Sequence, residues 1–154
     1  MFSDNAFYRA VAWLSLAAIV SGCAPHVAFA LSKDDQARFG DRVLRVSVPS
    51  KDPMIFGLND CIVYKAQTAH DDIVGWTVVL ASDWGHSSYP KWATVCTSQR
   101  LEYHGKYVVV DLCAQAIGAG GGCAGGGGIY RSRKGDVQGW QIQTANGWSD
   151  LPKY

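Results

Sequence analysis

A glycine-rich tract near the end of the chain has the spacing of a phosphate-binding loop. Residues 120–125 read GGGCAG, which satisfies the pattern G-x-G-x-x-G of dinucleotide-binding proteins. That pattern holds a pyrophosphate only where its glycines open a helix, because the amides at the helix N-terminus bind the phosphates. Here the tract continues through more glycines into the strand-like run IYRSR, and no Gly-Lys-Ser/Thr follows. We therefore expect no nucleotide cofactor.

The same tract is interpreted as a structural loop, because a cysteine stands at each of its ends. Glycine accepts the backbone angles of a tight, irregular loop, and a disulfide between Cys113 and Cys123 would limit the entropy that such a loop retains. In the alternative interpretation, exposed amides of residues 125–128 insert into a partner's cleft, where the lack of side chains permits close approach. These residues are Gly125, Gly126, Gly127 and Gly128.

No recognisable catalytic or metal-binding constellation occurs in the sequence. Residues 70–72 read HDD, but adjacent side chains on an extended chain point in different directions, whereas zinc ligands come from separated segments. We interpret them as a solvated turn before a strand at Ile73. Glu102 and Asp111 could pair across a hairpin, although Asp111 equally suits the polar side of an alternating strand. With no nucleophile elbow and no H-E-x-x-H, we expect no enzyme, no metal and no cofactor.

Two further stretches are candidates for contact with a partner. Residues 82–92 read SDWGHSSYPKW, a loop whose aromatic side chains either anchor a protein interface or fold back over the open end of the domain. The candidate contact residues of that loop are Trp84, His86, Tyr89 and Trp92. Arg131 and Arg133, followed by Lys134, lie two residues apart and so share one face of a strand. That face either meets an acidic partner or anionic lipid headgroups, or is solvated.

The cysteines indicate an oxidising compartment. Of the five, Cys23 lies in the leader, which leaves an even set of four that reads as two disulfides with three possible pairings. Cys113 with Cys123 is the natural local pair, which leaves Cys61 with Cys96. We favour this pairing, and the other two stay open.

The first residues have the composition of an export signal. After Arg9, residues 10–20 (AVAWLSLAAIV) form an apolar run with the length of a secretory h-region, too short to span a bilayer as a helix. The sequence VSGC, ending at Cys23, resembles the lipobox of bacterial lipoprotein precursors, in which the cysteine is acylated and becomes the mature N-terminus. The sequence AFA, ending at Ala30, instead offers the small-x-small pattern of ordinary signal cleavage.

We favour lipid attachment at Cys23, because the lipobox directly follows the apolar run. The domain organisation is then a signal peptide over residues 1–22 (1–30 for the other cut), a tether over 23–31 and a single β-rich domain over 32–154. The resemblance implies an outer-membrane lipoprotein facing the periplasm of a bacterial envelope, because residue 24 is Ala and not Asp.

The rest of the chain is typical of a globular β domain. Ser32 stands three residues before Asp35, a capping box that predicts a helix over residues 33–39. YHGK and Gly135-Asp136 predict hairpin turns, and no helix-length periodicity separates the strands. We predict a small antiparallel β-sandwich or barrel with one short N-terminal helix, stapled by disulfides. About eight short runs rich in β-branched and aromatic residues predict its strands, namely DRVLRVSVP, CIVYKAQT, IVGWTVVLA, WATVCTS, RLEY, KYVVVDLC, GIYRSR and GWQIQT.

Charge and composition exclude some classes of function and favour others. Lys and Arg number 14 against 13 Asp and Glu, so no excess of positive charge is present to neutralise nucleic acid, and we expect no nucleic-acid partner. We expect a non-catalytic exported binding protein, most concretely an inhibitor or immunity protein against a cell-wall hydrolase or secreted toxin. The alternatives are a structural or assembly lipoprotein of the envelope, and an envelope hydrolase or ligand-binding protein that uses His70, His86 or His104.

Overall fold

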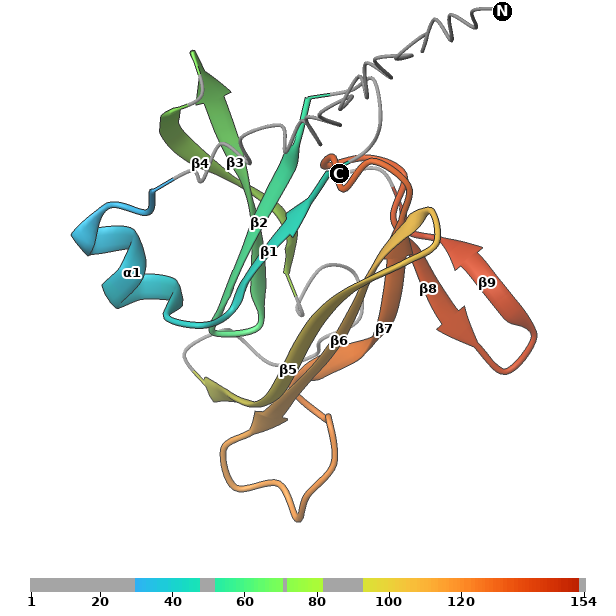
Figure 1. The fold of residues 1–154 in the computed structure, drawn as a ribbon. Coiled ribbons are helices and arrows are strands. Elements are labelled where there is room, and N and C mark those ends of the chain that lie inside the picture. Colours follow the sequence, from blue (N-terminus) through green and yellow to red (C-terminus); the bar gives the residue numbers. More distant parts are fainter. Residues whose placement is uncertain (1–29, 48–51, 71, 82–92, 153–154) are drawn as a thin grey trace, which may run out of the picture.

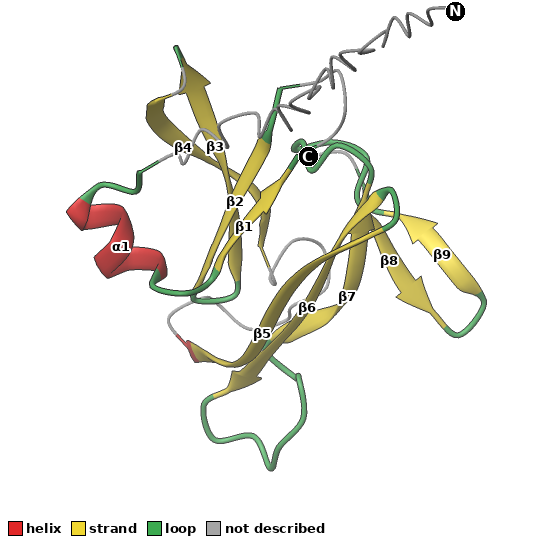
Figure 2. Ribbon diagram, in the orientation of Figure 1, coloured by secondary structure: helices red, strands yellow, loops and turns green. Residues whose placement is uncertain are grey.

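Nine antiparallel strands and one short helix make up the computed structural model, which describes residues 30–47, 52–70, 72–81 and 93–152 (Figures 1 and 2). One sheet has the order β1-β2-β3-β4 and the other β5-β6-β7-β8-β9, so each strand pairs with its neighbour in the chain. The predicted class, a mainly β antiparallel fold with one N-terminal helix, is confirmed. The elements are α1 (Lys33–Phe39), β1 (Val43–Val46), β2 (Met54–Asn59), β3 (Ile62–Ala69), β4 (Asp72–Ala81), β5 (Thr94–His104), β6 (Tyr107–Ala116), β7 (Gly126–Ser132), β8 (Gln141–Thr144) and β9 (Gly147–Asp150).

Helix α1 begins and ends where the sequence predicts. The Ser32 hydroxyl accepts a hydrogen bond from the backbone N–H of Asp35 at 3.0 Å, which is the capping interaction. The carboxylate of Asp35 accepts a hydrogen bond from Trp76 Nε1 at 2.7 Å and so ties the helix to β4. Phe39, at the end of the helix, is fully buried against β2, where a Cβ atom on Gly57 would lie only 2.7 Å from its ring. A glycine at this point of β2 lets the helix pack onto the sheet.

The main hydrophobic core lies between the two sheets. Phe56, Leu58 and Val63 contribute from the first sheet, and Val110 and the other inward side chains of β6 contribute from the second. Strand β6 alternates buried and half-buried residues along its whole length, which is the pattern that predicts a strand with one face on a core. No helix in the described part of the chain is long and apolar enough to cross a membrane.

Two disulfides cross-link the domain. Cys61, in the turn between β2 and β3, bonds to Cys96 of β5 and so joins the two sheets. Cys113, in β6, bonds to Cys123, in the loop before β7. This is the pairing that the sequence favours.

The structure differs from the predicted strands in three places. From Thr94 onward, the two predicted runs TVCTS and RLEY belong to one long strand, β5, whose register with β6 shifts between Cys96 and Ser98. The sequence pattern does not predict strands β2 and β9. Strand β2 reads MIFGLN and is buried on both faces, so it lacks the alternation that marks a half-buried strand, and β9 has only four residues.

The predicted hairpins form. Strands β5 and β6 pair up to His104 and Tyr107, and the turn consists of Gly105, with a φ of 63°, and Lys106. Strands β7 and β8 are also antiparallel neighbours, and the connection between them contains Gly135, with a φ of 60°.

Candidate functional site

The loop between β6 and β7 projects away from both sheets, at the bottom of Figure 1. Residues 117–124 (IGAGGGCA) are exposed apart from the half-buried Ala119, and none of them carries a charge. The Cys113–Cys123 disulfide closes the loop at its base. The amide of Gln115 adds a second tie by donating a hydrogen bond to the Ala119 carbonyl at 3.2 Å. A projecting backbone with few side chains is thus held in a defined shape.

The glycines at the end of the tract belong to the sheet. Gly126, Gly127 and Gly128 are the first residues of β7 and pair with residues of β6, and Gly125 before them is buried. A Cβ atom on Gly127 would collide with the carbonyl of Leu112, so glycine is needed here for the two strands to approach. The exposed amides of the tract therefore come from an earlier group of residues than the one named from the sequence, namely Gly118, Gly120, Gly121 and Gly122.

Two exposed apolar side chains stand beside the base of this loop. Ile117 is 66% exposed and Val95 is 53% exposed. Val95 is the register partner of Gln115, and the amide of Ile117 donates to the Ala93 carbonyl at 2.8 Å, so both side chains continue the same face of the ladder. An apolar contact surface therefore adjoins the exposed glycines.

The carboxylates proposed as a pair, Glu102 and Asp111, lie on one side of the β5–β6 hairpin with Arg100 between them. Arg100 approaches Glu102 at 3.6 Å and Asp111 at 3.8 Å, and His104 Nε2 donates to Glu102 at 2.7 Å. The hydrogen bond from His104, together with the charge of Arg100, lowers the pKa of Glu102. A carboxylate held ionised in this way suits a surface ion-pair network and not a general acid.

The other residues singled out from the sequence are dispersed or lie outside the described residues. His70 is exposed in the turn between β3 and β4, as predicted, and Asp72 is exposed at the start of β4. No group of three or more His, Cys, Asp or Glu side chains suited to a metal occurs in the part of the chain that the structure describes. The residues that lie outside it are the lipidation candidate Cys23 and the aromatic-loop residues Trp84, His86, Tyr89 and Trp92.

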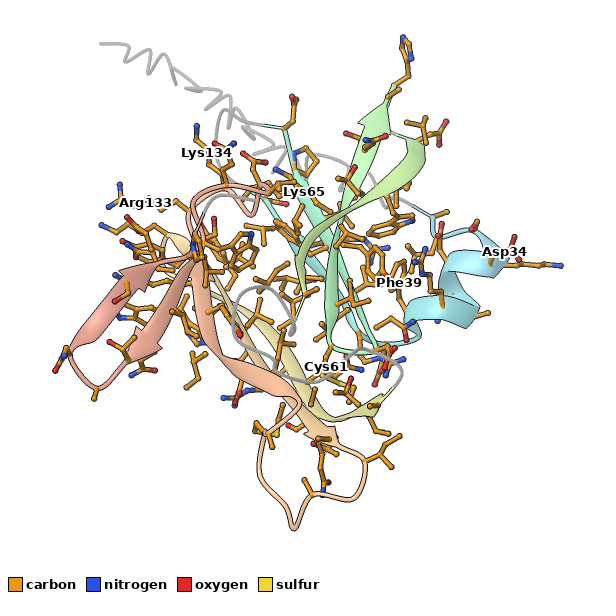
Figure 3. All side chains as sticks on the ribbon, turned by 180° about the vertical axis from the view of Figure 1, so that it is seen from behind. Asp34, Phe39, Cys61, Lys65, Arg133 and Lys134 are labelled. Atoms are coloured by element: carbon orange, nitrogen blue, oxygen red, sulfur yellow. A yellow bond between two sulfur atoms is a disulfide. The ribbon has the colours of Figure 1, made fainter. Side chains whose placement is uncertain are left out.

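A second candidate site is a pocket of about 490 Å³ on the outer face of the second sheet, here named the arginine pocket. Strand β7 ends at Ser132, so Arg131 is in the strand and Arg133 lies just after it, and the two do not share a strand face as their spacing predicts. Both arginines nevertheless line the pocket, together with Tyr107 of β6. Figure 3 labels Arg133 and Lys134 at this edge of the molecule. The lining residues are Tyr107, Arg131, Ser132, Arg133, Lys134, Gln138, Gly139, Gln141 and Asp150.

Aromatic rings hold the guanidinium groups of the arginine pocket. Arg131 lies 4.7 Å from the centre of the Tyr107 ring and 4.1 Å from that of the Trp148 ring, and Arg133 lies 5.5 Å from the Tyr107 ring. Arg133 also donates to the Tyr107 hydroxyl at 3.3 Å, and this hydrogen bond, with the nearby positive charges, lowers the pKa of Tyr107. Neither aromatic partner could be named from the sequence, because register and strand pairing bring them to the arginines.

Comparison of the chain with protein-family models, with curated proteins and with solved structures found no match.

Proposed function

We propose that the protein is an exported, non-catalytic binding protein that inhibits a cell-wall hydrolase or a secreted toxin. It acts by inserting the loop of residues 117–124 into the active-site cleft of that enzyme. The observation that supports this proposal is the loop itself, which projects from the domain, carries few side chains and is closed by the Cys113–Cys123 disulfide.

The chemistry of the loop suits a cleft lined by carboxylates. Glycoside hydrolases cleave their substrates between two catalytic carboxyl groups, and backbone N–H groups are hydrogen-bond donors to carboxylates. The loop contains no acidic residue that would be repelled from such a cleft. The glycines allow its amides to approach the catalytic groups closely, because no side chain stands in the way.

The disulfide and the apolar side chain at the base of the loop favour tight binding to a partner enzyme. A loop that is already closed in the free protein loses less conformational entropy on binding than an open one. Ile117 is an exposed apolar side chain that a partner can cover, and full burial of such a side chain contributes about 1.5–3 kcal/mol. The loop therefore combines a pre-organised backbone with an apolar anchor.

The proposed location follows from the leader and the disulfides. Removal of residues 1–22 and lipid attachment at Cys23 would anchor the protein to the outer membrane, facing the periplasm, where disulfides persist. The domain would then stand where it meets enzymes that attack the cell wall.

The proposal is tested with the oxidised protein and a panel of muramidases, amidases and endopeptidases acting on dye-labelled peptidoglycan. We expect stoichiometric inhibition of at least one enzyme class. Gly120→Tyr places a bulky side chain where a Cβ meets no neighbour, so the fold is kept while the approach to a cleft is blocked. Ile117→Asp removes the apolar anchor, and each variant should weaken inhibition at least about tenfold.

Val74→Asp is the matched control, because Val74 is 64% exposed on β4 of the other sheet. It should inhibit as the unmodified protein does. Failure of the protein to inhibit any enzyme of the panel, with capture of resident envelope proteins alone in a pull-down, would contradict the proposal and favour the assembly alternative. Equal inhibition by the Gly120→Tyr variant would show that the loop does not enter the cleft.

A further inference from the structure

We infer that the arginine pocket is a binding site for the phosphate group of a small soluble ligand. This site is separate from the projecting loop and does not depend on the function proposed for it. Its volume of about 490 Å³ lies within the range of small-molecule sites, and a sugar phosphate or glycerol phosphate is of a size to enter it.

The pocket gathers positive charge without neutralising it. Arg131, Arg133 and Lys134 all line it, and among the described residues no carboxylate forms an ion pair with any of the three. The one acidic side chain of the lining, Asp150, accepts a hydrogen bond from the Gln141 amide at 2.9 Å. Three cations against one carboxylate leave the pocket with a net positive charge.

The guanidinium group of Arg131 is fixed in place but keeps N–H donors that are available to a ligand. Its Nε atom donates to Gln141 Oε1 at 2.9 Å, and the rings of Tyr107 and Trp148 flank its guanidinium group. Within the described structure its two terminal amino groups donate to no protein atom. A guanidinium fixed by stacking and by one hydrogen bond presents its remaining N–H groups as a rigid fork, which matches the oxygens of a phosphate.

Charge favours a phosphate over a single carboxylate as the occupant. A phosphate monoester carries close to two negative charges at neutral pH and can be shared between Arg131 and Arg133. A monocarboxylate would neutralise only one of them. Arg133 already points a guanidinium at the Tyr107 hydroxyl, at 3.3 Å, so both cations converge on the same ring.

The binding test is a titration of the ¹⁵N-labelled protein with inorganic phosphate and with glycerol 3-phosphate at constant ionic strength, followed by NMR. We expect saturable shifts of the Nε–H signals of Arg131 and Arg133 and of the indole N–H of Trp148. The indole N–H of Trp140 is an internal control, because Trp140 is buried in the core and should not respond. Acetate at the same ionic strength should bind at least about tenfold more weakly, because it carries a single charge.

Two variants should act with opposite signs. Arg133→Gln removes one cation and should weaken phosphate binding about tenfold. Asp150→Asn removes the repelling charge while keeping an oxygen that can accept from Gln141, so it should strengthen binding. Arg100→Gln is the matched control, because Arg100 is an exposed arginine on β5 outside the pocket lining, and it should leave binding unchanged.

Several results would overturn the inference. These are shifts that follow ionic strength alone, acetate binding as tight as phosphate, or the same loss of binding in the Arg100→Gln and Arg133→Gln variants. Vesicles of phosphatidylglycerol test the other source of a phosphate group. Binding to these vesicles without any response to glycerol 3-phosphate would assign the arginines to a membrane surface and contradict a soluble ligand.

Discussion

Removing either disulfide should destabilise the domain to an extent set by the length of chain that the bond closes. The Cys113–Cys123 bond spans a sequence separation of 10, for which the loss of loop-closure entropy corresponds to about 2.7 kcal/mol in the free energy of unfolding. The Cys61–Cys96 bond spans a separation of 35, which corresponds to about 3.8 kcal/mol. Cys61 is also buried in the core, so its replacement by alanine adds a packing loss of about 1 kcal/mol.

The measurement is urea unfolding of two double variants, Cys113→Ala with Cys123→Ala and Cys61→Ala with Cys96→Ala, followed by tryptophan fluorescence. We expect the first to lose about 2.7 kcal/mol and the second about 4.8 kcal/mol. Under the proposed function, the first variant should also be the weaker inhibitor, because the projecting loop is no longer closed in the free protein. A larger stability loss in the first variant than in the second would refute the chain-entropy reasoning.

Three other features of the second sheet give measurable expectations. Burial raises the pKa of Tyr130 from 10.0 to about 12. Between these pH values the unfolded chain releases a proton that the folded protein keeps, so the free energy of unfolding should fall by about 3 kcal/mol as the pH rises. Tyr130→Phe should remove this part of the alkaline slope in denaturant titrations, and an unchanged slope would disprove the assignment. Gly127→Ala forces a side chain into a φ of 145° and against the carbonyl of β6, and should cost at least about 2 kcal/mol in urea unfolding. Gly120→Ala, which meets open space, should cost less than about 0.5 kcal/mol, and equal losses would argue against a close strand approach. Arg133→Gln should raise the pKa of Tyr107 toward its usual value, observable by NMR of the ring as the pH increases, because the main hydrogen bond that lowers it is lost.

Local sequence rules predict the elements whose signals are local. The helix follows from the capping box of Ser32 and Asp35, and β6 follows from its strict alternation. Strand β2 escapes prediction because both of its faces are buried, one of them under the ring of Phe39. The start of β7 escapes it because Gly126 and its neighbours resemble a loop in composition, yet serve a close approach of two strands.

The candidate sites likewise have some features that follow from local sequence and others that depend on strand pairing. The spacing of Arg131 and Arg133 predicts one face of a strand, but β7 ends at Ser132 and Arg133 reaches the pocket from the bend that follows. The aromatic rings that flank them come from β6 and β9, which only the pairing of strands brings together, so the arginine pocket depends on register that no short motif encodes. The projecting loop could be located from its glycines and cysteines, but the boundary between loop and sheet depends on the contacts of β6 with β7.

Because each sheet is formed by consecutive strands, the two sheets correspond to two consecutive segments of the chain. Residues 43–81 contain every strand of the first sheet and residues 94–150 every strand of the second, and neither sheet borrows a strand from the other. Each meander can therefore form from contacts between neighbouring segments, at a small cost in loop closure. The Cys61–Cys96 disulfide then links the two folded sheets covalently. This bond would form in the oxidising compartment to which the leader is expected to direct the chain. Export and the joining of the two sheets would on this basis be consecutive steps of one maturation process.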